Sequence, residues 1–290
     1  MVLAVAGAAT LTFSPFMLPL RLSSEPLTSM RKQTLLATTI LLMLVAQGGF
    51  AQKSAVLTKI FYPKDSVQFT ALHGEVGFGY RSREYGKTTM VICCTSEAGR
   101  FYMVFKKDIR HLSRMVEFDN GYAGEVFSFA SKQWEHEEGT WSRHELKGEP
   151  KDTVVYSIHN LRCLILKKSA AGITEVARFQ DYGNEVYWPE FDYPSCSISD
   201  EDRDGLPEFY LSYMGNSDGL DAKPYKQLVY TVGAAPTAAV KAKATAYYPA
   251  GNEDDVYRVE YDQRWKQLPA PVRGKSKRLI DRHRSANPSE

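Results

Sequence analysis

Short apolar runs rich in aromatic residues recur along most of this chain, and turn residues separate them. Clear examples are residues 88–94, 101–105, 209–214 and 227–232. Runs of four to eight residues bounded by Gly, Asn and Asp are typical of strands, whereas a helix needs a longer stretch with a period near 3.6. The 17 tyrosines and 14 phenylalanines agree, because aromatic side chains suit a pleated, half-buried surface. The chain is therefore predicted to be mainly β.

The same pattern predicts further strands and favours antiparallel sheets, arranged as a sandwich or a propeller-like fold. These strands are expected at residues 67–72, 76–80, 125–130, 153–159, 161–168 and 173–179. Residues 169–172 join the last two as a hairpin connection. Helix is expected only as one or two turns at residues 108–115 and as a minor closing helix at residues 257–268. The charged stretch at residues 134–152 indicates a long loop or an edge hairpin.

The first fifty residues carry the pattern of an export signal. A basic start and an apolar stretch lie in residues 30–51, and Gly49 and Ala51 place small residues at positions −3 and −1 of a cleavage site before Gln52. Residues 30–51 are thus predicted to be a signal peptide, with residues 1–29 a mis-assigned start or an extended leader. The apolar stretch is shorter than the roughly 20 residues that span a bilayer, so no transmembrane segment is expected after cleavage. The protein is expected to be periplasmic, outer-surface or secreted.

One β-rich domain is predicted at residues 52–270, followed by a basic, flexible tail at residues 271–290 that frays from about Arg273. The whole chain has a net charge of +2, and the leader accounts for that excess. A protein without a basic excess lacks the electrostatic footprint that phosphate backbones select, so nucleic acid is not expected as a partner.

Four cysteines bear on the redox state of the chain. Cys93 and Cys94 are adjacent, so on a strand they point to opposite faces and rarely bond to each other. An oxidising compartment would permit a disulfide, and Cys163 with Cys196 is then the pair to expect. Buried free thiols are the favoured alternative.

The sharpest chemical feature is an acidic loop at residues 200–208, with Asp at loop positions 1, 3 and 5 and Gly at position 6. A tight loop turns alternate carboxylates inward as hard oxygen ligands, and Gly permits the sharp turn. An EF-hand has its last acid at position 12, where this chain has Leu211, so that motif is excluded. The acid falls instead at position 9, Glu208, which resembles the calcium loops of integrin-like FG-GAP repeats that connect two strands.

This loop predicts a calcium site with a structural role, because all of its ligands are hard oxygens. The predicted ligands are the side chains of Asp200, Asp202, Asp204 and Glu208 and the backbone carbonyl of Leu206. A solvated, Asx-rich turn is the alternative. Against it, like charges that face one another repel, and a bound cation removes that cost.

Several segments of the second half together are similar to a known family. Residues 197–208 match a family motif I-T-D-L-D-x-D-G-I-A-E, residues 225–230 match a K-x-I-M-Y strand, and residues 257–261 match a closing segment. This order resembles a family of exported Bacteroidetes proteins loosely labelled surface polysaccharide biosynthesis proteins. The chain departs from it at Arg203 and at residues 216–218. The resemblance implies export, a β-rich fold and an acidic loop, and it names no reaction.

The preferred hypothesis is a structural or binding protein of the cell envelope whose partner is surface polysaccharide or an envelope protein. A glycan-binding face is suggested by aromatic residues that alternate with acids, although core packing explains the same pattern. The aromatic residues are Tyr182, Tyr187, Trp188, Phe191 and Tyr193, and the acids are Asp181, Glu185, Glu190 and Asp192. The alternative is an envelope enzyme that uses two of these carboxylates roughly 5–10 Å apart. No catalytic residue is assigned.

Overall fold

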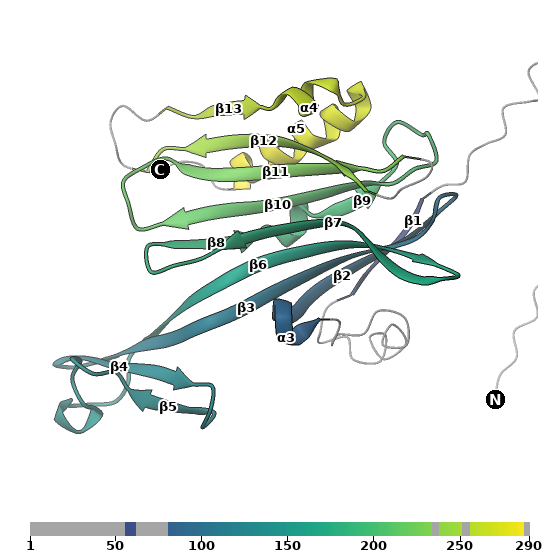
Figure 1. Cartoon of the computed structure of the whole chain (residues 1–290). Helices are drawn as coiled ribbons and strands as arrows, with labels where there is room; N and C mark the ends of the chain where they lie inside the picture. Colours follow the sequence, from purple (N-terminus) through teal and green to yellow (C-terminus); the bar gives the residue numbers. More distant parts are fainter. Residues whose placement is uncertain (1–55, 62–80, 234–237, 251–255, 287–290) are drawn as a thin grey trace, which may run out of the picture. The chain divides into compact units, whose positions relative to one another are not determined.

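Two antiparallel sheets of seven and six strands form the fold in the computed structural model (Figure 1). The structure describes residues 56–61, 81–233, 238–250 and 256–286. The predicted signal peptide and the predicted strands at residues 67–72 and 76–80 lie outside these ranges. The mainly β, antiparallel prediction is confirmed, and the two sheets are stacked as a sandwich and do not form propeller blades.

The seven-stranded sheet, sheet 1, is built around two long strands. Its strands are β1 (Leu57–Phe61), β2 (Lys87–Ser96), β3 (Gly99–Phe118), β4 (Gly121–Ser128), β5 (Gln133–His136), β6 (Thr153–Ser169) and β7 (Gly172–Tyr182). β3 pairs with β6 along almost its whole length, and β7 then pairs with β6. The first part of β3 also pairs with β2, whereas its last part pairs with β4. The far halves of β3 and β6, with β4 and β5, therefore form an extension of the sheet.

The six-stranded sheet, sheet 2, comes from the second half of the chain. Its strands are β8 (Tyr187–Phe191), β9 (Ser197–Ser199), β10 (Glu208–Ser217), β11 (Lys223–Thr231), β12 (Val240–Tyr248) and β13 (Arg258–Tyr261). The short helices are α3 (Ser82–Tyr85), η1 (Arg143–Glu145), η2 (Tyr193–Ser195) and α4 (Gln263–Gln267), and the long one is α5 (Ala270–Ala286). β10 is central, because it pairs with β11 on one edge and with both β8 and β9 on the other.

The core between the sheets follows from the two-residue period of the strands. On β10, Phe209, Leu211 and Tyr213 are buried against sheet 1, where Phe101 meets Phe209 edge-to-face at 5.7 Å. Burial of each such side chain contributes about 1.5–3 kcal/mol relative to exposure. Tyr210, which alternates with them, lies in a separate buried cluster on the other face of sheet 2.

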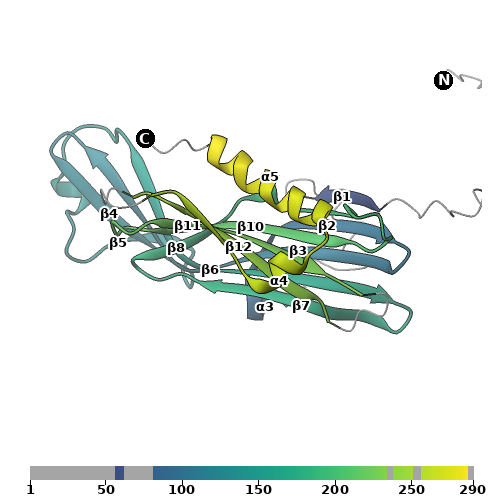
Figure 2. The same ribbon diagram turned by 90° about the horizontal axis from the view of Figure 1, so that it is seen from above.

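Helices α4 and α5 cover that other face, as the view from above shows (Figure 2). The buried residues of α5 are Val272, Ser276, Leu279 and Ile280, at the i, i+4, i+7 and i+8 spacing of an amphipathic helix. The prediction that the chain frays from Arg273 is wrong, because these residues pack α5 against sheet 2. The apolar positions are few and are separated by basic residues in the sequence, so the helix was not recognised there. No helix in the described part of the chain is both long and apolar enough to cross a membrane.

Three other sequence expectations differ from the structure. Residues 108–115 are not helical but lie inside β3, where the register shifts between Ile109 and His111 and the residues are only partly buried. A strand that is only partly buried need not alternate apolar and polar residues strictly, so its sequence does not identify it as a strand. The two strands expected at residues 153–168 are the single strand β6, and the closing helix expected at residues 257–268 is β13 followed by α4.

All four cysteines are buried free thiols. Cys94 lies in the core between the sheets and Cys93 in a cluster on the opposite face of sheet 1, as their adjacency predicts. Burial raises the pKa of the Cys163 thiol, and the nearby Cys196 raises it further. The Cys163 and Cys196 thiols therefore stay protonated and behave as small apolar side chains.

Candidate metal centre

The acidic loop, residues 200–208, connects two strands that pair directly with each other. β9 lies antiparallel to β10, with Ser199 opposite Glu208 at the base of the loop. Gly205 has φ +84°, a left-handed conformation that glycine adopts without strain. The expectation of a strand-to-strand loop with a glycine at the sharp turn is thereby confirmed.

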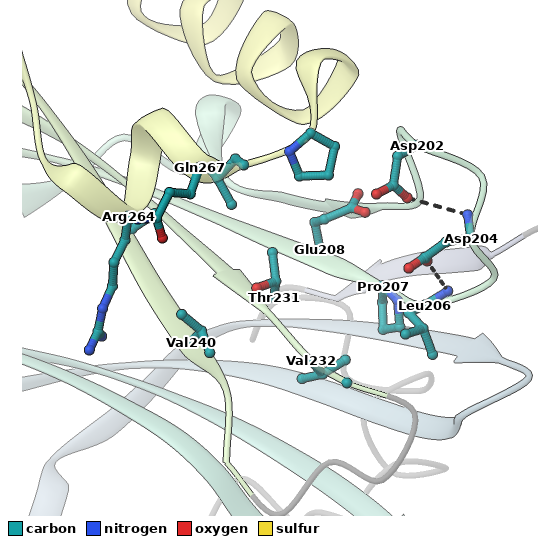
Figure 3. Close-up of a pocket in the computed structure, with 14 residues that line it drawn as sticks. Asp202, Asp204, Leu206, Pro207, Glu208, Thr231, Val232, Val240, Arg264 and Gln267 are labelled. Carbon is teal, nitrogen blue, oxygen red and sulfur yellow. Dashed lines mark hydrogen bonds between the residues drawn. The ribbon is translucent and has the colours of Figure 1, made fainter.

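The four acidic side chains of this loop converge on one point. One carboxylate oxygen from each of Asp200, Asp202, Asp204 and Glu208 lies within 4.8 Å of the others. Figure 3 shows Asp202 and Glu208 directed toward each other from the two sides of the loop. The backbone carbonyl of Leu206 stays a prediction as a fifth ligand. The described part of the chain thus contains an acidic cluster that could hold a metal ion.

Backbone amides of the loop hold part of this arrangement in place. The amides of Asp204 and Gly205 donate to the two oxygens of Asp200, at 3.0 and 2.9 Å. The Leu206 amide donates to Asp204 Oδ1 at 2.8 Å. Such turns also form without an ion, so these bonds explain the loop's shape and do not identify a ligand.

The electrostatics of the cluster favour a cation. Glu208 is only 4% exposed, and its burial raises the pKa of its carboxyl to about 8. A hydrogen bond from the Glu201 amide opposes the shift, while the charges of Asp202, Asp200 and Asp204 add to it. Burial and neighbouring acids also raise the pKa of Asp202. Without an added positive charge, the cluster is stabilised by protonation of Glu208.

The basic residues that α5 brings to the loop bind a different acid. Lys275 Nζ lies 3.1 Å from Glu201 Oε1 and 2.8 Å from Ser199 Oγ, and an Arg278 nitrogen lies 3.4 Å from Glu201 Oε2. Burial alone would raise the pKa of Glu201, but Lys275, Ser199 and Arg278 together more than offset it and the pKa is lowered. The negative charge of Glu201 is thus balanced by Lys275 and Arg278 on the outer side of the loop, and these two bases pair with Glu201 and not with the four clustered acids.

A surface hollow of about 620 Å³ leads to the cluster from the side of α4. Figure 3 shows Arg264 and Gln267 of α4, Thr231 of β11 and the acidic pair Asp202 and Glu208 around it. The hollow gives an ion from solvent a route to the buried Glu208 carboxylate. It also leaves room for water to complete the coordination sphere.

The other acids singled out in the sequence are mostly held by their own partners. Asp181 accepts a hydrogen bond from the Tyr187 hydroxyl at 2.9 Å and lies 3.7 Å from Lys226 Nζ. Glu190 accepts from Lys107 Nζ at 2.8 Å. Glu185 lies exposed in the turn before β8. Asp192 is the centre of a larger polar network.

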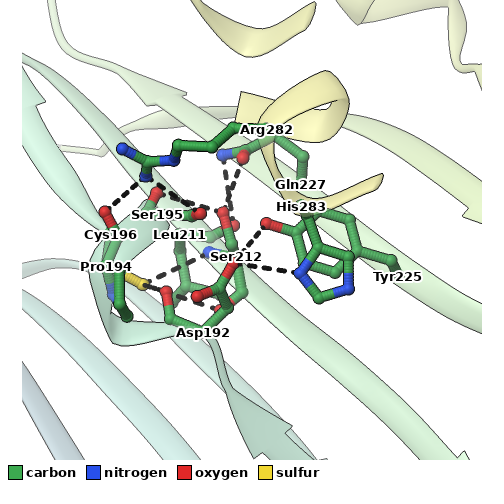
Figure 4. A network of polar contacts seen from close by, with 10 residues as sticks. All are labelled: Asp192, Pro194, Ser195, Cys196, Leu211, Ser212, Tyr225, Gln227, Arg282 and His283. Atoms are coloured by element: carbon green, nitrogen blue, oxygen red, sulfur yellow. Dashed lines mark hydrogen bonds and ion pairs between the residues drawn. The ribbon is translucent and has the colours of Figure 1, made fainter. Parts of the chain in front are cut away.

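This network joins α5 to sheet 2 (Figure 4). The Tyr225 hydroxyl donates to Asp192 Oδ2 at 2.8 Å, and His283 Nδ1 lies 3.3 Å from the same oxygen. The His283 ring also stacks on Tyr225, with centroids 3.8 Å apart. His283 could not be recognised from the sequence, since 91 residues separate it from Asp192 and no local pattern connects them.

The aromatic residues suggested for a glycan-binding face do not share one surface. Phe191 and Tyr193 belong to the core between the sheets, where both rings contact Phe105. Tyr187 is bound to Asp181. Core packing therefore explains much of the pattern.

Comparison of the chain with protein-family models, curated proteins and solved structures finds no match. The resemblance to exported Bacteroidetes proteins stays a prediction that rests on its motifs. The geometry of the acidic loop is accordingly the clearest indication of function in this chain.

Proposed function

We propose that the acidic loop binds a calcium-type divalent cation and that the ion stabilises the junction of β9, β10 and α5. The observation that carries the proposal is the convergence of four carboxylate oxygens within 4.8 Å, one of them from the buried Glu208. Carboxylate oxygens are hard ligands, which Ca²⁺ prefers, and Ca²⁺ tolerates the irregular geometry of a flexible loop.

The position of the loop in the fold supports a structural role. Glu208 begins β10, the strand that pairs with three others in sheet 2. Ser199 and Glu201 at the start of the loop bind Lys275 of α5. An ion held by the loop would therefore fix the end of the central strand and the platform on which α5 rests.

The setting of this function is the cell envelope, with the protein exported through its predicted signal peptide. The leader pattern at residues 30–51 and the resemblance of the second half to exported Bacteroidetes proteins support this. Contact with surface polysaccharide or an envelope protein belongs to the same hypothesis.

An enzymatic role for the second carboxylate group is less well supported. Glu190 shares one hollow with Glu185 and another with Asp192. Yet Glu190 is paired with Lys107, and Asp192 accepts from Tyr225 and lies beside His283. A glycosidase needs one carboxyl kept protonated and a second left charged and reactive, which these pairings oppose.

Thermal unfolding in calcium and in chelator tests the proposal. An ion that binds only the folded state adds about 2.7 kcal/mol at 100 times its Kd. For a domain of this size that is a Tm rise on the order of 5–10 °C. The Asp202→Ala variant is expected to lose the rise, because it removes one converging ligand. Asp221→Ala, which removes an exposed acid from the turn between β10 and β11, is the matched control and should keep it.

Two outcomes would contradict the proposal. The first is a Tm that does not change between calcium and chelator. The second is a calcium-dependent rise that survives in Asp202→Ala, because the ion would then bind elsewhere.

A further inference from the structure

One edge of β6 changes its environment halfway along the strand. From Asn160 to Ser169 this edge pairs with β7, and the last bond of the ladder runs from the Gly183 amide to the His159 carbonyl at 3.0 Å. Along residues 153–158, β6 pairs with β3 on its other edge only, within the part of the chain that the structure describes. Beside residues 153–158, no described strand lies in the position that β7 occupies beside the rest of β6.

The backbone of this segment is oriented for pairing. The direction of the N–H and C=O groups alternates along a strand. Because the His159 carbonyl points to the β7 side, those of Ser157, Val155 and Thr153 point there too. The Thr153 amide is taken by Asp152 Oδ1 at 2.7 Å, and the Ser157 carbonyl lies 3.1 Å from His159 Nδ1. The amide and carbonyl of Val155 are the central pair that an added strand would bind.

Three consecutive side chains in the middle of the segment are apolar or aromatic and exposed. Val154, Val155 and Tyr156 are 47%, 57% and 55% exposed, and residues 153–158 contain no charge and no proline. Natural sheets protect open edges with lysine, proline, bulges or a covering element, because a bare edge pairs with other chains. An edge without those devices indicates a surface that receives a partner.

Two hollows flank this edge and would take the side chains of an added strand. One, of about 650 Å³, is lined by Val155 and Ser157 together with Trp188, Glu185 and Asp218. The other, of about 470 Å³, is lined by Ile158, Arg110 and Val186, among others. Both hollows are also lined by Ile158, Asn184 and Glu185, so they adjoin each other at this edge. Successive side chains of a strand point to opposite faces, so only alternate residues of a bound segment would face the hollows.

The larger hollow selects for positive charge. Its three acids are Glu185, Glu190 and Asp218. Glu190 is balanced by Lys107 at 2.8 Å, whereas neither Glu185 nor Asp218 forms an ion pair with another described residue. Charge complementarity therefore favours a Lys or Arg side chain, whose stem would lie beside Trp188.

We propose that residues 153–158 of β6 accept an extended segment of a partner protein as an added strand, with a basic side chain in the hollow of Glu185 and Asp218. Main-chain bonds to the Val155 region supply affinity in this mode of recognition, and the two hollows supply specificity. The site is independent of the acidic loop, because Glu208 begins β10 and Asp218 follows its other end.

A library of random octapeptides tests the proposal. Peptides are selected for binding to the natural protein, and those that also bind the Val155→Pro variant are removed. Proline removes the outward amide and no bond of the β3–β6 ladder, so the variant is expected to stay folded. Selected peptides should share a Lys or Arg at one position and bind Val155→Pro at least tenfold more weakly. The double variant Glu185→Gln, Asp218→Asn should weaken the same peptides severalfold and reduce the salt dependence of binding.

Hydrogen exchange on the unaltered protein gives a second readout that needs no variant. A selected peptide should slow exchange of the Val155 amide, which points to the open edge. Peptides that bind both proteins equally, or a selection with no enrichment, would overturn the proposal. A dimer of this chain that Val155→Pro dissociates would assign the edge to a second copy, and preferential binding of an oligosaccharide would assign the hollow to sugar. Either result also overturns it.

Discussion

Two carboxyl groups beside sheet 2, those of Glu208 and Asp192, are both removed from solvent, yet their pKa values are shifted in opposite directions. Burial raises the pKa of Glu208, at the start of β10, to about 8. Burial also acts to raise the pKa of Asp192, after β8, but hydrogen bonds from His283, Ser195 and Tyr225 more than offset it and bring the pKa to about 2. Burial thus acts in the same direction on both carboxyls, and the donors around Asp192 reverse the sign of its shift, whereas the single amide bound to Glu208 does not.

This difference shows which carboxylate lacks a counter-charge. Asp192 is surrounded by donors that come from β11, η2 and α5, so the protein itself stabilises the charge. Glu208 is surrounded chiefly by the acids of its own loop and accepts one amide, from Glu201. A buried charge needs a partner or is neutralised. At Glu208 the partner is a proton, or in our proposal a metal ion.

The largest effect is expected from removal of the carboxylate that the protein already satisfies. Asp192→Ala leaves the Tyr225 hydroxyl without its acceptor and removes the polar contact between His283 Nδ1 and the Asp192 carboxylate. Loss of a hydrogen bond to a charged group costs about 1.5–3 kcal/mol. We expect a loss of that size in the free energy of unfolding, measured by urea denaturation, and faster hydrogen exchange along α5.

Asp221→Ala is the control for this change, because Asp221 is an exposed acid. Surface substitutions of that kind usually stay within about 0.5 kcal/mol. If Asp192→Ala lowered the free energy of unfolding no more than this control, the polar network around Asp192 would not stabilise the fold. Asp192 would then not be a carboxylate that the protein stabilises, in contrast to Glu208.

The acidic loop was predictable from the sequence because its determinants are local. Asp200, Asp202 and Asp204 alternate within five residues, Gly205 permits the turn, and Glu208 begins the next strand. Backbone geometry over so short a span leaves few arrangements, so sequence spacing translates into spatial convergence. The antiparallel β class was predictable for a similar reason, since alternation and turn residues are local properties.

The Asp192 network and the helix that completes it were not predictable, because they depend on contacts between distant segments. α5 has apolar residues at helical spacing, but basic residues dominate its sequence, and only packing against Tyr210 and Val229 shows why it folds. The continuity of β6 through Asn160 is likewise decided by its partner β3, which runs beside it from Arg100 to Val116. Tertiary contacts overrode weak local preference in both cases.

A smaller effect on the free energy of unfolding is expected from Glu208→Gln, and in chelator it is a gain in stability, not a loss. In chelator the neutral amide removes the repulsion within the acidic loop, so the variant should be more stable than the natural protein by on the order of 1–2 kcal/mol near pH 8. In calcium the order should reverse, because the amide is a poorer ligand and the natural protein gains the energy of ion binding.

The pH dependence in chelator provides the control for this prediction. Between its ordinary pKa of 4.5 and its folded pKa of about 8, Glu208 holds a proton in the folded state that it loses in the unfolded state. Its contribution to stability is therefore complete below pH 4.5 and is lost as the pH rises toward 8. Asp192 behaves oppositely, since its contribution is present above pH 3.8 and is lost as the pH falls toward 2. Glu208→Gln should abolish the first trend and keep the second, and a variant that kept both would show that another group titrates.

The smallest effect on stability is expected from Arg278→Ala, which tests whether the basic residues of α5 balance the charge of the acidic cluster. The Arg278 side chain is 67% exposed and lies 3.4 Å from Glu201, outside the cluster of four acids. An exposed ion pair contributes about 0.2–1 kcal/mol, and alanine returns part of that through its higher helix propensity. We expect a change within about 0.5 kcal/mol and an unaltered calcium dependence of the Tm. If Arg278→Ala instead destabilised the protein strongly in chelator and little in calcium, the basic residues of α5 would be balancing the charge of the cluster, and the loop would not need an ion to do so.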